Sequence, residues 1–255
     1  MKKKFKRMIR NFILFIALII LTFSIILKDQ DITEIYGILI YSKKQYILIA
    51  ILAMCIYVLC EAINIRRTLK ALGEKRNIFQ NIKYALIGFF FSGITPGGSG
   101  GQPMQIYYMN KEGYNVSHTT IALLTHLCGY QMSAIFLGIL SALFSQDIFN
   151  TNLSILFIIG TLFNIIALSI TLIGIFSTSL SNKLVYLFVK LLKFLKYKKI
   201  NNVEEKINRE LNIYHESAKY IKKNKHTFIK AIIIAFMQIL VYHSVPYFTY
   251  KAFGL

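Results

Sequence analysis

The chain has 255 residues, 55% of them hydrophobic, and carries 30 Lys and Arg against 11 Asp and Glu, a formal net charge of +19. A soluble domain of this size cannot bury so much apolar surface in one core, and the excess of Ile, Leu and Phe excludes intrinsic disorder. These quantities predict an all-α, polytopic integral membrane protein.

The basic residues are grouped, and the grouping favours a membrane over a nucleic acid as the partner. Residues 1–10 hold six bases, residues 66–83 hold six and residues 177–230 hold thirteen, whereas 28–45 and 145–152 show no basic excess. This alternation is typical of a chain that crosses a bilayer and keeps its basic loops in the cytoplasm. We therefore expect a cytoplasmic N-terminus, no nucleic-acid site, and attraction of anionic lipid headgroups to the basic loops.

Two apolar segments predict the first two spans. Asn11–Leu27 follows the basic N-terminus, and we interpret it as a retained span because no small-residue cleavage site follows it. Tyr46–Ile65 then returns inward, toward Arg66 and Arg67. Its one charge, Glu61, lies about a turn from the inner end, so an interfacial position and an intramembrane site both stay open.

The next apolar segment, Tyr84–Asn110, is divided by a Gly- and Pro-rich loop into two short arms. Each predicted arm is about two helical turns, too short for a hydrocarbon core of about 30 Å. We expect a re-entrant helical hairpin over residues 84–113, which enters and leaves the membrane on one side. A single crossing would place the thirteen bases of 177–230 outside, against the charge pattern.

Three more spans and one cytoplasmic segment complete the predicted elements. The spans are Ser117–Phe144, Leu153–Phe176 and Phe228–Tyr250, which makes five in all. Residues 177–230 form the basic cytoplasmic segment. Within it, residues 183–199 predict an amphipathic helix along the inner surface, and apolar residues at helical spacing from Val203 to Ile221 predict a second helix.

The loop between the two short arms carries the strongest chemical signal. Five glycines and two prolines fall within Gly93–Pro103. Bare backbone is costly in lipid, but it is tolerated where it lines a watery cavity or binds a ligand. Loop amides and a half-helix starting near Pro103, capped by Gly101 or Gln102, would suit a lipid phosphate. A tight turn between close-packed helices is the alternative interpretation.

The span after the hairpin adds polar side chains on one helical face, among them His126 and Tyr130, with Gln131 alongside. His126 either binds a headgroup or relays protons, or it hydrogen-bonds to a neighbouring helix. Gln238 and Tyr242 in the last span leave a similar choice open. The candidate substrate-binding residues are Thr95, Gly97, Gly98, Ser99, Gly100, Gly101, Gln102, His126, Tyr130 and Gln131.

No catalytic residue, metal site or cofactor is predicted. The sequence has no HExxH, no GxSxG, no paired carboxylates within a span and no Cys/His spacing for a metal. Its three cysteines include no CxxC pair.

The sequence GITPGGSGGQPMQIYY at residues 93–108 resembles the lysylphosphatidylglycerol synthase transmembrane family, also called flippase-like, and Lys111-Glu112-Gly113 and Tyr130-Gln131 fit the resemblance. It implies a bacterial inner-membrane protein that binds and translocates a phospholipid or polyprenyl-phosphate-linked lipid, lysyl-phosphatidylglycerol among them. Such a protein would contribute to resistance against cationic antimicrobial peptides. The alternative is the membrane part of a phosphatidylglycerol lysyltransferase, working with a separate catalytic chain that uses lysyl-tRNA. A structural membrane scaffold is a third interpretation.

The chain departs from the pattern of this family in three respects. No segment outside the spans is long enough for an aminoacyl-transferase domain, so we expect no catalysis by this chain alone. Relatives continue past position 255, so we expect a single domain over 1–255 that lacks its C-terminal spans. Some relatives carry an acid where Gln102 stands, which weakens the case for a cationic headgroup at this loop.

Overall fold

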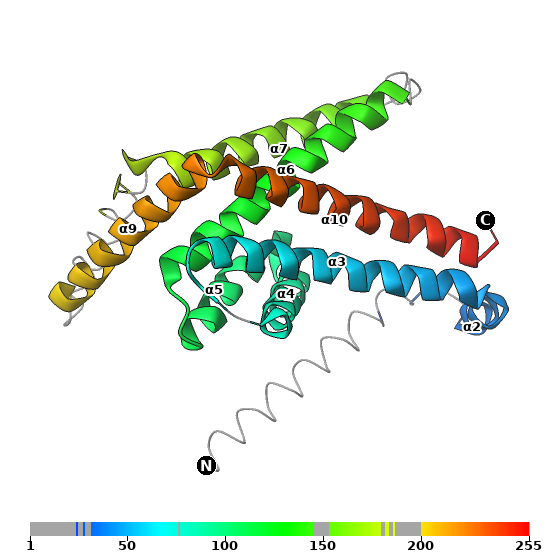
Figure 1. Ribbon diagram of the computed structural model, residues 1–255. Helices are drawn as coiled ribbons and strands as arrows, with labels where there is room; N and C mark the ends of the chain where they lie inside the picture. Colours follow the sequence, from blue (N-terminus) through cyan, green and yellow to red (C-terminus); the bar gives the residue numbers. More distant parts are fainter. Residues whose placement is uncertain are drawn as a thin grey trace, which may run out of the picture. The chain divides into compact units, whose positions relative to one another are not determined.

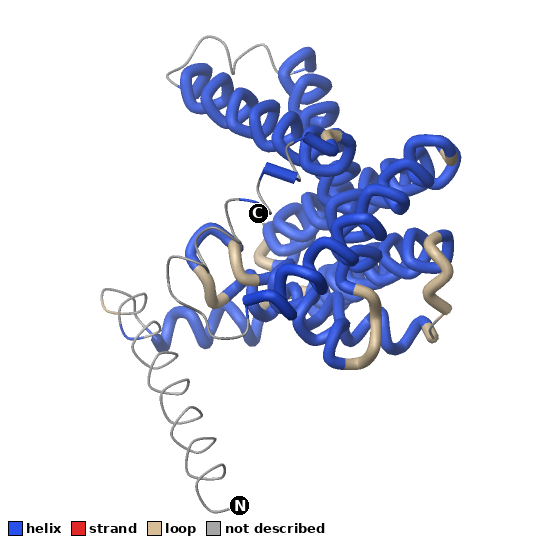
Figure 2. Tube along the Cα trace, turned by 90° about the vertical axis from the view of Figure 1, so that its left-hand side faces the viewer, coloured by secondary structure: helices blue, strands red, loops and turns tan. Residues whose placement is uncertain are grey.

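A computed structural model describes residues 32–75, 77–144, 153–179 and 200–254, with the single positions 24, 28, 182, 183 and 186. In this part of the chain every regular element is a helix (Figures 1 and 2), which confirms the all-α prediction. The chain forms two compact units, residues 1–50 with 246–255 and residues 51–245, and the candidate site lies in the second. The elements are α2 (Ile32–Tyr41), α3 (Lys44–Ala71), α4 (Ile78–Gly93), η1 (Pro96–Gly98), α5 (Gly101–Lys111), α6 (Val116–Phe144), α7 (Leu153–Phe176), α9 (Ile200–Lys223) and α10 (Lys225–Ala252).

Four of the described helices, α3, α6, α7 and α10, are long and apolar enough to cross a membrane. They contain the last four predicted spans. A helix of suitable length and composition is therefore confirmed at each of these four positions. In α7 only Thr171 and Ile175 are buried among the described side chains, so most of its surface is available to lipid. The predicted first span at 11–27 and the amphipathic helix at 183–199 lie outside the described residues.

Helices α4 and α5 lie antiparallel over the segment predicted as a hairpin, but the first arm is longer than predicted. It begins at Ile78, not Tyr84, after Asn77 in extended backbone. Gln80 Oε1 accepts the Asn77 amide hydrogen at 3.3 Å, one half of a capping box. The 16 residues of α4 and the 11 of α5 measure about 24 Å and about 16 Å, less than the about 30 Å of a hydrocarbon core.

The open end of the hairpin is clamped by one carboxylate. Glu112, directly after α5, accepts hydrogen bonds from the Lys83 ammonium and the Tyr84 hydroxyl of α4. Gly113 has φ of 90°, which glycine adopts without strain, and directly follows the helix end. Glu112 therefore holds the end of α5 beside Lys83 and Tyr84 of α4.

Two further carboxylates hold the start of α6. Glu74 Oε1 accepts from the Asn115 amide at 3.2 Å and lies 3.1 Å from His118 Nδ1. Glu210 of α9 accepts from the Ser117 hydroxyl at 2.7 Å and the Ser117 amide at 3.3 Å. Negative charge is favourable at the N-terminus of a helix, where backbone amides lack partners. The connector, residues 112–115, is thus fixed to α3, α4 and α9.

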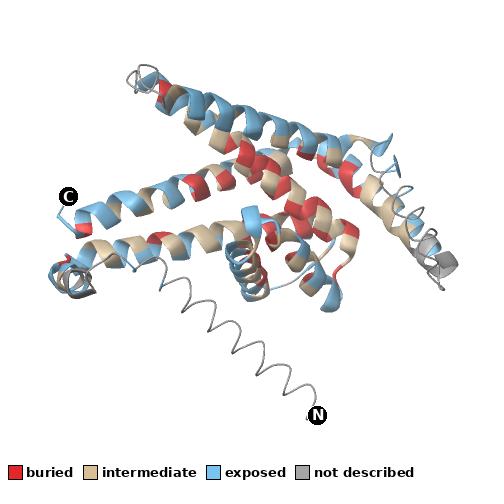
Figure 3. Ribbon diagram, turned by 180° about the vertical axis from the view of Figure 1, so that it is seen from behind, coloured by how far each residue is buried: buried red, intermediate tan, exposed pale blue. Residues whose placement is uncertain are grey.

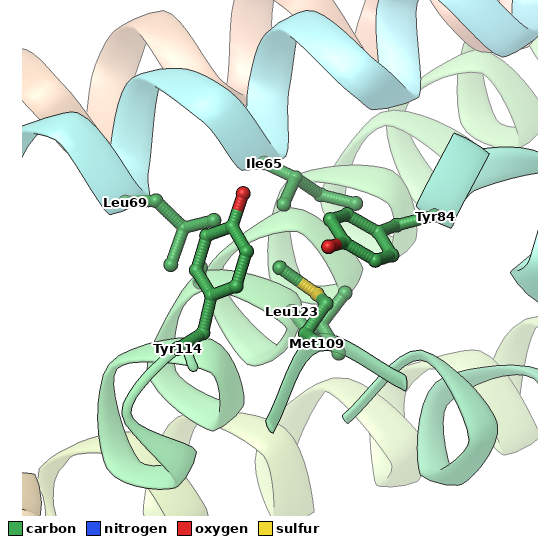
Figure 4. Close-up of a cluster of buried hydrophobic side chains, with 7 residues drawn as sticks. Ile65, Leu69, Tyr84, Met109, Tyr114 and Leu123 are labelled. Atoms are coloured by element: carbon green, nitrogen blue, oxygen red, sulfur yellow. The ribbon is translucent and has the colours of Figure 1, made fainter. Parts of the chain in front are cut away.

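A cluster of buried apolar side chains joins α3 to the hairpin and to α6 (Figure 4). The rings of Tyr84 and Tyr114 meet edge to face with centroids 5.5 Å apart, an arrangement that aromatic pairs prefer. The cluster packs the base of the hairpin against α3. Its members are Ile65, Leu69, Tyr84, Met109, Tyr114, Ala122 and Leu123.

Helix α9 includes the residues of the second helix predicted in the basic segment, Val203 to Ile221. It packs on α6 and α7. Ala218 and Ile221 are buried with Ile175 of α7. The Tyr214 hydroxyl donates to the carbonyl of Gly174 at 2.6 Å. Burial raises the pKa of Tyr214 to about 12, so this phenol keeps its proton and remains a donor at physiological pH.

Helices α6 and α10 cross closely, in the region where buried residues gather (Figure 3). A Cβ added to Gly129 would lie 3.1 Å from the Ala231 oxygen and 3.2 Å from the Ile232 Cα. Ser133, one turn further on, donates to the Gly129 carbonyl at 2.7 Å and to the Ile232 carbonyl at 3.4 Å. A small residue at position 129 is what permits this approach, as in many membrane helix pairs.

The change Gly129→Ala should therefore lower thermal stability in detergent, because the obstructing atoms belong to backbone and cannot turn away. We expect the free energy of unfolding to fall by roughly 1–2 kcal/mol. This is the cost of overpacking minus the gain in helix propensity from glycine to alanine. The matched control is Gly138→Ala on the same helix, whose Cβ would meet Phe157 at an ordinary 3.8 Å. Equal melting temperatures for the two variants would contradict the close crossing.

Candidate functional site

The tip of the hairpin is a tight turn that two glycines permit. Gly97 and Gly98 have φ of 62° and 70°, which residues with a Cβ rarely adopt. The Gly98 amide donates to the Thr95 carbonyl at 3.1 Å, and the Ser99 amide to the Pro96 carbonyl at 3.3 Å. Residues 96–99 are all exposed, so the backbone of the tip is accessible.

The Thr95 side chain connects the two arms at the tip. Its hydroxyl donates to the Phe91 carbonyl at 2.6 Å and accepts from the Gly100 amide at 2.9 Å. A Cβ at Gly100 would lie 2.5 Å from the Thr95 Cγ2. Glycine at position 100 therefore leaves room for the Thr95 side chain, with which any larger residue at that position would collide.

The start of α5 approaches α4 just as closely. A Cβ at Gly101 would lie 2.2 Å from the Ser92 hydroxyl and 2.8 Å from the Gly88 carbonyl. The tight turn between packed helices, the alternative interpretation of this loop, is therefore present. It accounts for the glycines at 97, 98, 100 and 101 by backbone conformation or by packing.

The same turn leaves hydrogen-bond donors at the start of α5. Gly100 is the cap, one residue earlier than expected, and Pro103 is the third helical residue. The amides of Gly101 and Gln102 have no carbonyl one turn earlier within the helix, and the positive end of the helix dipole lies beside them. These amides are the groups with which the tip could bind an anion.

One turn into α5, Gln105 joins the hairpin to α3. Its side chain is 2% exposed, and its Nε2 donates to the Glu61 carboxylate at 2.7 Å and to the Tyr84 carbonyl at 3.1 Å. Gly88 makes room, because a Cβ there would lie 2.3 Å from Gln105 Nε2. Glu61 is thus half-buried and hydrogen-bonded to the hairpin, a contact that the sequence did not reveal.

Phenols and amides from several helices lie near Glu61 and Tyr57. Tyr57, one turn earlier on α3, lies near Glu61, Tyr130 of α6, Tyr242 of α10 and the side-chain amide of Gln238. The rings of Tyr57 and Tyr242 have centroids 5.3 Å apart. Gln238 is completely buried, and neither of its polar side-chain atoms has a hydrogen-bond partner within the usual distance among the described residues. We call Tyr57, Glu61, Gln105, Tyr130, Gln238 and Tyr242 the polar cluster.

Of the two interpretations of His126, the structure supports the hydrogen bond to a neighbouring helix, with Asn64 of α3 as the partner. Asn64 Nδ2 lies 3.1 Å from His126 Nδ1 and donates to the Ala231 carbonyl at 2.9 Å. Because the second contact needs a donor, this end of the Asn64 amide is its nitrogen, and His126 Nδ1 must accept. The imidazole is then neutral with its proton on Nε2, which makes His126 a donor toward any ligand.

The predicted residues thus fall into two groups. Thr95 and residues 97–102 make the tip and the first turn of α5. Tyr130 belongs to the polar cluster, with His126 one turn before it. Gln131 is buried and its Oε1 has no partner among the described residues. In the described part of the chain, the hydrogen bond from Gln105, one turn after the tip, to Glu61 joins the helix of the first group to the polar cluster. Binding by any of these residues stays a prediction.

Sequence reasoning missed Gln105, Tyr57 and Asn64, because single polar residues inside apolar helices look alike until the helices are packed. No group of three or more His, Cys, Asp or Glu side chains among the residues described could hold a metal ion. The geometry therefore offers anion donors at the tip and a mixed set of hydrogen-bonding groups around one carboxylate.

Comparison with protein families matches residues 12–255 to the model described as the lysylphosphatidylglycerol synthase TM region. This chain belongs to the lysylphosphatidylglycerol synthase transmembrane family. No curated protein and no solved structure matches it. The chain is therefore a membrane-embedded protein related to lysylphosphatidylglycerol synthase, and the motif of residues 93–108 that suggested this family forms the tip and most of α5.

In this synthase-related domain, Thr95→Ala should loosen the tip, because the Gly100 amide loses its acceptor. One hydrogen bond of roughly 0.5–1.5 kcal/mol corresponds to about two- to tenfold faster amide exchange. Hydrogen–deuterium exchange of a peptide covering residues 95–104 measures this directly. Ser99→Ala is the control, since the exposed Ser99 hydroxyl only donates to the Pro96 carbonyl. Unchanged exchange in Thr95→Ala would contradict the role given to Thr95.

Proposed function

We propose that this protein binds the headgroup of a phospholipid or a polyprenyl-phosphate-linked lipid and moves it across the bacterial inner membrane. The observation that carries the proposal is the hairpin tip, which joins two helices too short to span the bilayer and is followed by backbone donors at the start of the second helix, α5. Non-helical backbone at membrane depth is tolerated where it lines a water-filled cavity or is buried in protein. Transporters commonly build substrate sites from broken helices of this kind.

The phosphate would bind at the tip and the rest of the headgroup in the polar cluster. The amides of Gly101 and Gln102, with the dipole of α5, favour the negative charge. His126 offers a donor at Nε2, and Tyr130 can donate or accept. Basic side chains such as Lys70 and Lys111, both exposed near the connector, would concentrate anionic lipid at the cytoplasmic surface.

Lysyl-phosphatidylglycerol is the candidate lipid that the family suggests. Its transfer to the outer leaflet would make the cell surface less negative and weaken the attraction of cationic antimicrobial peptides. The basic residues at 1–10 support a cytoplasmic N-terminus.

The second candidate is the membrane part of a phosphatidylglycerol lysyltransferase, and the description of the family favours it. Lysine would then be transferred from lysyl-tRNA by a separate catalytic chain. Expressing this chain alone and analysing the lipids separates the candidates. Lysyl-phosphatidylglycerol made without a partner would overturn our expectation that the chain is not catalytic alone.

Transport is tested in liposomes that contain a fluorescent phosphatidylglycerol, whose outer-leaflet fraction is destroyed by a membrane-impermeant reductant. The protein should expose the inner-leaflet lipid faster than protein-free liposomes. Gly98→Val and Gly100→Val should slow this exposure, because one forces φ of 70° on a β-branched residue and the other collides with Thr95. Gly160→Ala on α7 is the control, since nothing lies within 4 Å of its Cβ.

Two outcomes of this assay would count against the proposal. One is exposure no faster than in protein-free liposomes, for every headgroup tried. The other is equal transport by the Gly98, Gly100 and Gly160 variants, provided that all three remain folded. Lipids retained on gentle purification, identified by mass spectrometry, should include the transported species.

A further inference from the structure

Glu61 is a carboxylate deep within α3 whose partner is neutral. It lies ten residues before the end of the helix at Ala71, about 15 Å along the axis. The hydrogen bond it accepts comes from an uncharged amide, that of Gln105. The ion pairs Lys83–Glu112 and His118–Glu74 of the described residues do not involve Glu61.

The groups that face Glu61 supply no permanent positive charge. Among the described residues they are Tyr57 on its own helix, Gln105 on α5 and Tyr130 on α6, with Tyr242 of α10 beside Tyr57. On α4, the Tyr84 carbonyl accepts a hydrogen bond from Gln105. The Tyr84 hydroxyl donates to Glu112.

The basic residues His126, Arg66 and Arg67 form no ion pair with Glu61 among the described contacts. His126 is neutral with Nδ1 bound to Asn64, as argued above. Arg66 and Arg67 lie five and six residues further along α3, and Arg66 is exposed. An unpaired carboxylate in such surroundings is costly, and the usual resolution is to bind a cation or a proton.

We propose that Glu61 is a proton-binding site whose protonation controls the attachment of the hairpin to α3. The carboxylate takes one proton from water and returns it to water, with no other bond made or broken. When ionised, it accepts a charge-assisted hydrogen bond from Gln105, roughly twice as strong as a neutral one. When protonated, it loses that advantage, and Gln105 keeps its bond to the Tyr84 carbonyl.

This inference rests on the proposed function, because it makes a proton gradient the source of energy for lipid movement. Gln105 lies one turn from the donors of Gly101 and Gln102, so a change at Glu61 is passed to the tip by a single helical turn. Loosening α5 from α3 would move the tip without unfolding the base, which Glu112 holds to α4.

The first test measures the proton without requiring transport. Infrared spectra of the purified protein in nanodiscs, recorded from acid to alkaline pH, should show the C=O band of a protonated carboxylic acid at neutral pH. Glu61→Gln should remove this band, whereas Glu216→Gln, an exposed acid on α9, should leave it. Gln105→Leu should shift the band by removing its hydrogen bond. The proposal would be overturned if the wild type showed no such band at neutral pH. It would also be overturned if Glu61→Gln left the band unchanged.

A second test asks whether the site drives lipid movement. Liposomes with fluorescent phosphatidylglycerol and an imposed pH gradient should expose the lipid several-fold faster than liposomes without one, and Glu61→Gln should abolish this difference. Lipid movement that ignores the gradient would overturn the proposal and leave the proposed function standing. A Glu61-dependent band without any lipid movement would retain the proton site and reject the proposed function. Removal of the band by sodium ions at constant pH would replace the proton with a metal cation and overturn the proposal.

Discussion

The hydrogen bond from Gln105 to Glu61 is the interaction on which the arrangement of the hairpin and the polar cluster depends. A carboxylate inside an apolar helix must find a donor, and the donor here is supplied by a helix too short to span the membrane. Gly88 on α4 leaves the space through which the Gln105 side chain passes. This polar contact therefore adds to the apolar cluster at the base and joins α5 to α3 one turn from the tip.

Carboxylates also organise the base of the hairpin. Glu112 closes its open end, while Glu74 and Glu210 hold the start of α6. The tip, by contrast, is exposed and is held by the hydroxyls of Thr95 and Ser92, the second donating to the Gly98 carbonyl at 3.3 Å. A firmly held base and a tip stabilised by a few hydrogen bonds suit an element whose end meets a ligand.

The sequence allowed the described spans, the helical arms and the unusual loop to be predicted, because apolar runs, glycines and prolines report local physics. The start of α4 was placed too late, although Asn77 and Gln80 carry the spacing of a capping box before the apolar run. The pairs Gln105–Glu61 and Asn64–His126 could not be predicted, since each joins helices far apart in the chain. The tight turn and the anion site were offered as alternatives for the loop. In the structure the tight turn is present, and the backbone amides that could bind an anion directly follow it, at the start of α5.

The central claim is that the hairpin enters and leaves the membrane on one side, and cysteine labelling tests it most directly. Phe79→Cys and Lys111→Cys, at exposed positions on α4 and α5, would be introduced after Cys55, Cys60 and Cys128 are replaced by serine. A membrane-impermeant thiol reagent should label both positions from the same face of sealed vesicles, the cytoplasmic one, and neither from the other. Labelling of the two positions from opposite faces would contradict the account.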